Sequence, residues 1–189
     1  MAGRRIGILA LQGAFLEHEH SLRRCGAKPI EVRTIGDLEQ AEALIIPGGE
    51  STTIGKIMQR FGLDQAIISR TKQGMPLWGT CAGMILMAKE IADSEQPGLK
   101  LMDIRVRRNA FGRQVDSFEA DLEVIGIGRC RGVFIRAPYV ERVWADTQIL
   151  AYYQEKIVMV QQYNLLATAF HPELTDDPSI HRYFLEMLG

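Results

Sequence analysis

We predict an α/β fold from two patterns in this sequence. In the first half, apolar strand-like runs alternate with amphipathic segments, which predicts a mostly parallel central sheet with helices on both faces. After residue 98, strand-like runs follow one another at short spacing, which predicts that some strands of the second half are antiparallel. Right-handed crossovers are the expected connections in the parallel part.

The first half contains four apolar runs and four helical patterns. The strands are predicted at 6–11, 30–32, 43–46 and 76–78. The helices are predicted at 14–25, 51–61, 64–72 and 82–91. Gly26 is a typical helix stop after the first of them.

The second half contains six more strand-like runs, at 122–127, 132–135, 142–144, 149–153, 157–160 and 165–170. A closing helix is predicted to begin at Asp177-Pro178-Ser179, with Asp177 as N-cap and proline in the first turn. Because no repeat or linker interrupts the chain, we expect residues 1–189 to form a single domain.

The composition excludes several classes of protein. The 22 Lys and Arg residues balance 23 Asp and Glu residues, so no excess of positive charge points to nucleic acid. The apolar runs fall short of the roughly 20 residues that cross a bilayer and of a secretory signal. The three cysteines, an odd number, argue against a disulfide framework. We therefore expect a cytoplasmic protein that binds neither nucleic acid nor membrane.

The segment Gly79-Thr80-Cys81-Ala82-Gly83 lies between a predicted strand and a predicted helix. This is the context of a G-x-nucleophile-x-G turn, in which flanking glycines relieve a strained corner. The start of the following helix favours a thiolate at Cys81, and the N–H of Ala82 is placed to bind an oxyanion. The alternative is that Cys81 is a small buried core residue.

The other two cysteines lack such a frame. Cys25 lies late in an amphipathic helix, and Cys130 lies between Arg129 and Arg131, whose charges are expected to lower the pKa of its thiol.

A thiol nucleophile needs a base, and His171-Pro172-Glu173 supplies one together with a carboxylate to orient it. In extended backbone, residues i and i+2 point to the same side, so Glu173 is expected to reach the His171 ring. The alternative for His171 is a hydrogen-bonded surface histidine. His18, His20 and His181 are expected to be solvated, and no spacing suggests a zinc site.

A glycine-rich loop, Gly48-Gly49-Glu50-Ser51, follows a predicted strand and opens a helix. An N–H of Gly48 or Gly49 is suited to complete the oxyanion hole, and Glu50 and Ser51 to hold the polar end of a substrate. A phosphate-binding loop is excluded, because Gly55 is one residue too far from Gly49 and isoleucine follows the lysine.

These motifs, in this order, resemble those of the class I (triad) glutamine amidotransferases. The chain is more specifically similar to the family of glutaminase subunits of pyridoxal 5′-phosphate synthases. The narrower resemblance rests on motifs spread over nearly the whole chain, at 11–13, 48–53, 108–114, 117–119, 134–138 and 170–175.

The resemblance implies a flavodoxin-like three-layer sandwich. It implies Cys81 as nucleophile, His171 as general base and acid, and Glu173 as the orienting carboxylate. Glutamine-binding roles are implied for Gly49, Glu50, Ser51, Arg108, Ile135 and Arg136, beside the oxyanion hole expected at Gly48, Gly49 and Ala82. The implied substrate is L-glutamine, and the implied partner is a separate synthase subunit that receives ammonia. We expect neither a cofactor nor a metal.

Two alternatives stay open. One is another cysteine-elbow enzyme of the same fold, related to intracellular proteases or deglycases, which would not require the 48–51 loop or the His-Pro-Glu motif. The other is a non-enzymatic interaction subunit, against which the intact Cys81, His171 and Glu173 argue.

Overall fold

The computed structural model describes residues 3–92, 94–109 and 117–189. Its helices are α1 (Phe15–Arg24), α2 (Ile35–Glu39), α3 (Ser51–Phe61), α4 (Leu63–Lys72), α5 (Ala82–Met87), the 3-10 turn η1 (Pro172–Leu174) and α6 (Ser179–Glu186). Its strands are β1 (Arg5–Leu9), β2 (Lys28–Val32), β3 (Ala43–Ile46), β4 (Leu77–Thr80), β5 (Ala88–Ile91), β6 (Met102–Arg107), β7 (Ser117–Val124), β8 (Gly128–Ile135), β9 (Tyr139–Val143), β10 (Gln148–Tyr153), β11 (Lys156–Gln162) and β12 (Leu165–Thr168).

One ten-stranded sheet has the order β2-β1-β3-β4-β12-β11-β9-β6-β5, with β10 paired to β11, while β7 and β8 form a separate hairpin. The strands β2, β1, β3, β4 and β12, which are neighbours in this order, pair in parallel. The strands β12, β11, β9 and β6 pair antiparallel to one another. The prediction of a mostly parallel sheet with antiparallel strands in the second half is confirmed.

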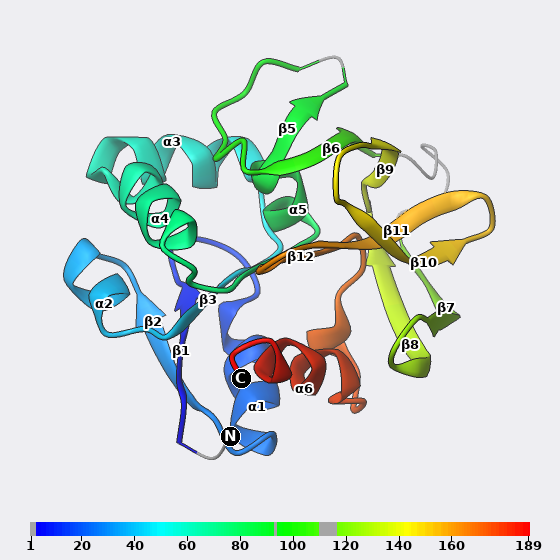
Figure 1. Ribbon diagram of the computed structural model, residues 1–189, viewed down its shortest axis with the longest axis horizontal. Coiled ribbons are helices and arrows are strands. Elements are labelled where there is room, and N and C mark those ends of the chain that lie inside the picture. The colour runs from blue at the N-terminus through cyan, green and yellow to red at the C-terminus, as the bar shows by residue number, and fades with distance from the viewer. Residues whose placement is uncertain (1–2, 93, 110–116) are drawn as a thin grey trace.

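Helices cover both faces of the sheet and make three layers. In Figure 1, α3, α4 and α5 lie on one side of the parallel strands and α1 and α6 on the other. The parallel strands are buried on both faces, so β3 and β4 have no exposed residue. One hydrophobic core includes residues of both halves of the chain, among them Trp78, Phe134 and Phe184.

Two strand pairings bring the ends of β3, β4 and β12 together where the candidate site lies. Ile46 of β3 is paired with Gly79 of β4, and Thr80 of β4 is paired with Thr168 of β12. Since these strands are parallel, the residues that follow them emerge at one edge of the sheet. Ligand sites of open α/β sheets lie at this edge.

The predicted helix at 82–91 was too long. The structure ends α5 at Met87, and Ala88–Ile91 forms β5, which pairs in parallel with β6. Neither α2 nor β6 was predicted from the sequence. The alternation of buried Met102, Ile104 and Val106 along β6 was a readable strand signal. The segment that forms β5 shows no such alternation. Its strand conformation depends on its pairing with β6.

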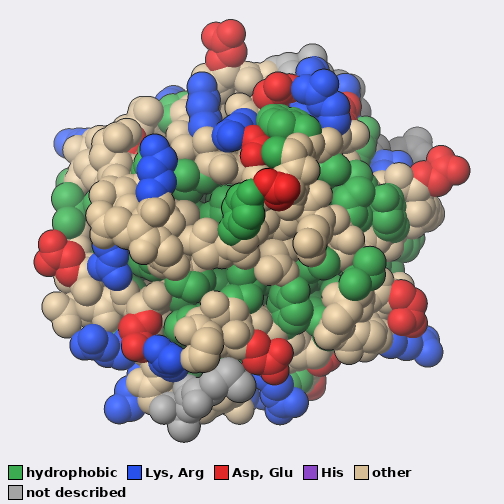
Figure 2. Space-filling view, in the orientation of Figure 1, with side chains coloured by type: hydrophobic (Ala, Val, Ile, Leu, Met, Phe, Trp, Pro, Cys, Tyr) green, Lys and Arg blue, Asp and Glu red, His purple; other side chains and the backbone are tan. Residues whose placement is uncertain are grey.

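Acidic and basic side chains are interspersed around the face in Figure 2, with hydrophobic groups between them. None of the described helices is long and apolar enough to span a membrane.

Candidate active site

Three loops meet at the carboxyl edge of the parallel strands: the one after β3, the turn after β4 and the segment after β12. The N–H of Cys81 donates to the carbonyl oxygen of Thr168 at 2.8 Å, which ties the turn after β4 to the end of β12. The N–H of His171 donates to the carbonyl oxygen of Val133 at 2.7 Å, which ties the other segment to β8. The cysteine and the histidine are therefore held by backbone at neighbouring strand ends.

Cys81 occupies a strained turn. Its backbone has φ 49° and ψ −100°, a conformation that side chains with a Cβ rarely adopt. A Cβ at Gly79 would overlap the backbone of Gly83, and one at Gly83 would overlap the carbonyl oxygen of Ile46. The two glycines are thus required by close backbone packing, as the sequence predicted. The thiol is 3.9 Å from the carbonyl oxygen of Ile135.

His171 and Glu173 contact one another directly. Nδ1 of His171 is 2.7 Å from Oε1 of Glu173, and both side chains are buried. The prediction of the contact is confirmed, but its backbone reason was wrong. His171 precedes a turn of 3-10 helix that includes Glu173, so the carboxylate reaches the ring from that turn and not from an extended strand.

The ionisation of the pair follows from its contacts. Burial lowers the pKa of His171, but a hydrogen bond to Cys81, a hydrogen bond to Glu173 and the negative charges of both partners raise it to about 10. Burial raises the pKa of Glu173, but the neighbouring imidazoles of His18 and His171, the latter through a hydrogen bond, lower it below the usual range. The Glu173 carboxylate therefore favours the protonated, imidazolium form of His171.

The glycine loop packs against the imidazole. A Cβ at Gly48 would overlap Cε1 of His171, so only glycine lets the loop approach this ring. The carbonyl oxygen of Gly48 accepts a hydrogen bond from the N–H of Ala14 at 3.1 Å. Oε1 of Gln12 accepts one from the N–H of Glu50 at 2.7 Å. The segment after β1 therefore holds the glycine loop in place.

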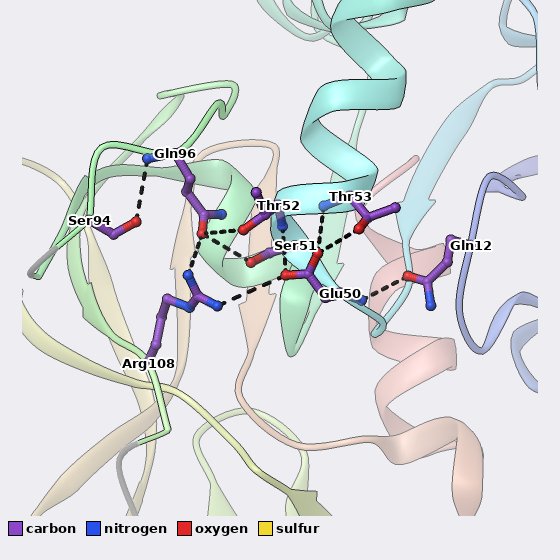
Figure 3. Close-up of polar contacts among 8 residues, drawn as sticks. All are labelled: Gln12, Glu50, Ser51, Thr52, Thr53, Ser94, Gln96 and Arg108. Atoms are coloured by element: carbon purple, nitrogen blue, oxygen red, sulfur yellow. Dashed lines mark hydrogen bonds and ion pairs between the residues drawn. The ribbon is translucent and has the colours of Figure 1, made fainter.

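Glu50 is both a helix cap and a member of a polar cluster (Figure 3). Its carboxylate accepts hydrogen bonds from the N–H groups of Thr52 and Thr53, at 3.0 and 2.7 Å. The side-chain hydrogen bond from Thr53 contributes most to lowering the pKa of Glu50 to about 2, against the opposing effect of partial burial. The carboxylate is anionic near neutral pH and stabilises the start of α3.

Gln96 links Arg108 to the capped start of α3 by hydrogen bonds (Figure 3). Oε1 of Gln96 accepts from Nη1 of Arg108 at 2.8 Å, and from the hydroxyls of Ser51 and Thr52 at 3.2 and 3.3 Å. Nη2 of Arg108 is 3.9 Å from the Glu50 carboxylate. Among the described residues, Nε2 of Gln96 has no hydrogen-bond partner. Gln96 thereby joins the Arg108 guanidinium to the first turn of α3.

Ile135 and Arg136 end β8 beside the cysteine. The Ile135 carbonyl faces the thiol, and Arg136 has a left-handed backbone with φ 44°. Residues 110–114 of the motif at 108–114 lie outside the described residues. The predicted site residues that the structure describes thus come from the three meeting loops and from the segments at Arg108 and 135–136.

A family profile covers nearly the whole chain. The profile of the SNO glutamine amidotransferase family matches residues 8–189. The chain belongs to this family. Its similarity to single family members extends over nearly the whole chain.

Curated relatives carry the name pyridoxal 5′-phosphate synthase subunit PdxT. The protein of Desulforudis audaxviator is 58% identical over 186 residues, which are 97% of this chain and 98% of the relative. The protein of Desulforamulus reducens is 56% identical over 185 residues, again 97% of this chain and 98% of the relative.

Solved structures agree in fold. A crystal structure of a glutamine amidotransferase has a TM-score of 0.94 and 52% identity, and the match covers 97% of this chain and 98% of that chain. The flavodoxin-like sandwich expected of the family is thereby confirmed. The PurLQS structure from Thermotoga maritima, at 17% identity and a TM-score of 0.74, shares the fold.

Two histidines of this amidotransferase lie in other environments than predicted. His18 and His181 were expected to be solvated, yet both are fully buried, while His20 is exposed as expected. The apolar contacts of α1 and α6 on the sheet cover them. No role was predicted for Gln12 or Gln96. Gln12 lies in the 11–13 motif, which was a readable signal, whereas Gln96 lies in no motif and only the fold brings it to the site.

The expectation for Cys130 was wrong as well. Burial raises the pKa of its thiol to about 11, and nearby carboxylates add to this effect. Arg129 and Arg131 point into exposed ion pairs with Asp121 and do not face the thiol.

Within the described ranges, no group of three His, Cys, Asp or Glu side chains is arranged to hold a metal ion.

Proposed function

We propose that residues 1–189 form a single glutaminase domain that releases ammonia from L-glutamine for a pyridoxal 5′-phosphate synthase subunit. The observation that carries the proposal is the 2.7 Å contact between His171 and Glu173 beside a cysteine on a strained turn. A buried carboxylate, an imidazole and a thiol in this relation are the parts of a nucleophilic triad.

The proposed reaction is acyl transfer through a thioester. His171 takes the proton of Cys81, and the thiolate attacks the side-chain carbonyl carbon of glutamine. Collapse of the tetrahedral intermediate breaks the C–N bond, and the imidazolium donates its proton to the leaving nitrogen, which departs as ammonia. His171 then takes a proton from water as the water attacks the thioester carbonyl. The C–S bond breaks, glutamate leaves, and His171 returns its proton to the Cys81 sulfur. Glu173 stabilises the imidazolium and keeps its Nδ1–H directed away from the thiol.

The proposed oxyanion hole consists of the backbone N–H of Ala82 with an N–H of Gly48 or Gly49. Ala82 begins α5, so its N–H is among those that an α-helix leaves without an intrahelical partner. Gly48 lies against the imidazole that must protonate the leaving group. Donors at these positions would stabilise the negative charge that develops on the substrate oxygen.

The proposed substrate site holds the charged end of glutamine. Arg108 is suited to the α-carboxylate, because a guanidinium binds carboxylates through two parallel hydrogen bonds. Its partner Gln96 anchors the guanidinium to the first turn of α3. Glu50 is anionic and suited to the α-ammonium group. Gly49, Ser51 and the Ile135-Arg136 segment complete the proposed contacts.

The proposed partner and compartment follow from the product and the thiols. Ammonia released into water is protonated and is no longer a nucleophile, so a synthase subunit must receive it directly. The names of the full-length relatives describe a subunit of such a synthase. All three cysteines are free, which suits the reducing cytoplasm. The proposed chemistry requires no cofactor and no metal ion.

The test is glutamate release from glutamine by wild type and Cys81→Ala, each with and without a pyridoxal 5′-phosphate synthase subunit. We expect turnover that the synthase stimulates and that the substitution abolishes. Turnover that survives in Cys81→Ala would mean a different nucleophile, and equal turnover with and without the synthase would contradict the partner. Peptide and glyoxal substrates, assayed in parallel, distinguish a related protease or deglycase.

A further inference from the structure

A chain of buried polar groups lies behind Glu173, on the face of the sheet that α1 and α6 cover. Nε2 of His18 is 3.5 Å from Oε2 of Glu173 and 3.2 Å from Oγ1 of Thr80. Nδ1 of His18 is 3.0 Å from Nε2 of His181. Both histidines and Thr80 are fully buried.

Two atoms in this series of buried polar groups have no hydrogen-bond partner among the described residues: Oε2 of Glu173 and Nδ1 of His181. The first faces Nε2 of His18, at a separation slightly longer than a formed N–H···O bond. An unpartnered buried carboxylate oxygen is costly, so a donor at this position has a strong reason to point at it.

The unpartnered Nδ1 of His181 determines which nitrogen of each histidine carries the proton. A buried N–H without an acceptor is rarer than an unpartnered acceptor, so Nδ1 of His181 carries the lone pair and its Nε2 carries the proton. That proton is donated to Nδ1 of His18. His18 is then protonated on Nε2, the nitrogen that faces Glu173 and Thr80.

Both histidines are neutral in this arrangement. Burial lowers the pKa of His18 more than the Glu173 carboxylate raises it. Burial, with His18 and Arg24 nearby, lowers the pKa of His181 well below its usual value. A neutral His18 can therefore donate one proton to Glu173 and accept one from His181 without carrying a charge.

We propose that His18 is a positioning residue, whose Nε2–H holds the second oxygen of Glu173 and thereby directs the first oxygen at His171. His181 maintains the tautomer of His18 that makes this possible. The kinetic part of the inference rests on the proposed glutaminase function; the hydrogen-bond chain itself does not. The residue also links α1 to the triad, because Thr80, its other contact, directly precedes Cys81.

The effect of a substitution at His18 on the protonation of Glu173 depends on the charged and titratable groups around this carboxylate. His171 faces it from its own loop, His18 from α1, and His181 stands behind His18 on α6; Glu17 acts on His18 from the same helix. Removal of the donor at His18 leaves Oε2 of Glu173 bare. A barer carboxylate takes up a proton at higher pH and then no longer stabilises the imidazolium.

The experiment compares His18→Phe, which keeps a ring and removes the donor, with His18→Gln, whose amide replaces Nε2–H. His20→Phe is the matched control on the exposed face of α1. The first readout is the pH dependence of Cys81 alkylation by iodoacetamide, followed on the Cys81 peptide by mass spectrometry. The second is the separate measurement of kcat and KM for glutamine with the synthase subunit present.

For His18→Phe, we expect the acid limb of Cys81 alkylation to move up by at least about one pH unit. The kcat should fall about 10- to 100-fold, as for losses of groups that orient a reacting residue, with KM changed by less than about twofold. His18→Gln should recover most of both effects, and His20→Phe should match wild type. A wild-type alkylation profile in His18→Phe, or equal damage in His18→Phe and His18→Gln, overturns the proposal.

Should both substitutions prevent folding, nitrogen-15 NMR of the wild-type imidazoles decides. We expect His18 and His181 to be neutral with the proton on Nε2 from pH 6 to 9. An Nδ1–H tautomer at His18, or titration of its ring near the ordinary histidine pKa, overturns the proposal. Absence of glutamate release by wild type would refute the proposed function, while the alkylation and NMR results would still decide the role of His18.

Discussion

Nδ1 of His171 and Oε1 of Glu173 are 2.7 Å apart, although Pro172 alone separates these residues in the chain. The contact forms where the segment after β12 turns into a 3-10 helix, which brings the carboxylate back towards the ring. The same turn directs the other carboxylate oxygen into the protein, towards α1. One glutamate thus connects the site at the sheet edge with the buried face beneath α1 and α6.

The nucleophile is the first prediction. Cys81→Ala should lower kcat for glutamine hydrolysis by at least about 10⁴-fold, because loss of a triad nucleophile leaves only the residual effect of binding and oxyanion stabilisation. The measurement is glutamate release with the synthase subunit present. Cys25→Ala, which removes a half-buried thiol of α1's C-terminal end, is the control and should retain wild-type turnover. A similar loss in both variants would contradict the assignment.

The His171–Glu173 pair should make stability depend on pH. The pKa of His171 is raised from 6.5 to about 10, so its contribution is complete below about pH 6.5 and is lost as pH rises through 10. The pKa of Glu173 is lowered from 4.5, so its contribution is present above pH 4.5 and is lost as pH falls below it. The unfolding free energy of wild type should therefore exceed that of Glu173→Gln most between about pH 4.5 and 6.5.

Urea unfolding of the two proteins at pH 4, 5.5, 8 and 10 measures this difference. A difference that stays constant over the whole range would show that the pair's ionisation does not contribute to stability.

The turn around Cys81 predicts a steric effect on stability. Gly83→Ala should lower the unfolding free energy by at least about 2 kcal/mol, because its Cβ would overlap the carbonyl oxygen of Ile46, a backbone atom that cannot move aside cheaply. Gly36→Ala in α2 is the control, since a Cβ there meets only Thr34 Oγ1 at 3.8 Å. That variant should be neutral or slightly more stable, because alanine favours a helix over glycine. Equal urea midpoints for the two variants would refute the close-packing argument.

The polar cluster in Figure 3 predicts an effect on substrate binding. Arg108→Ala should raise KM for glutamine by about 10- to 100-fold, the loss expected when a charged hydrogen-bonding partner of a carboxylate is removed. Steady-state kinetics with the synthase subunit measure this effect. Arg142→Ala, which removes an exposed arginine that pairs with Glu90, should leave KM unchanged. An unchanged KM in Arg108→Ala would remove Arg108 from the substrate site.

Much of the site was readable from local sequence. Gly79, Cys81 and Gly83 imply a strained turn, because only glycine tolerates the backbone contacts that such a corner imposes. The neighbouring His171 and Glu173 imply a hydrogen-bonded pair through their short separation. The glycine inference succeeds because it depends on a few consecutive residues whose backbone is closely packed. The His171–Glu173 contact was predicted from an extended backbone, and it forms instead from a 3-10 turn, because the two residues are close enough in sequence for either conformation to bring them together.

The sequence by itself therefore determined the α/β class, most helices and strands of the first half, and the residues of the proposed triad. Only the tertiary structure decided that β5 is a strand, that Gln96 meets Arg108, and that His18 lies buried behind Glu173. Each of these depends on segments distant in sequence, such as α1 with η1, or β5 with β6. Burial of a histidine on an amphipathic helix is set by what packs over it, and no local pattern of residues records that partner.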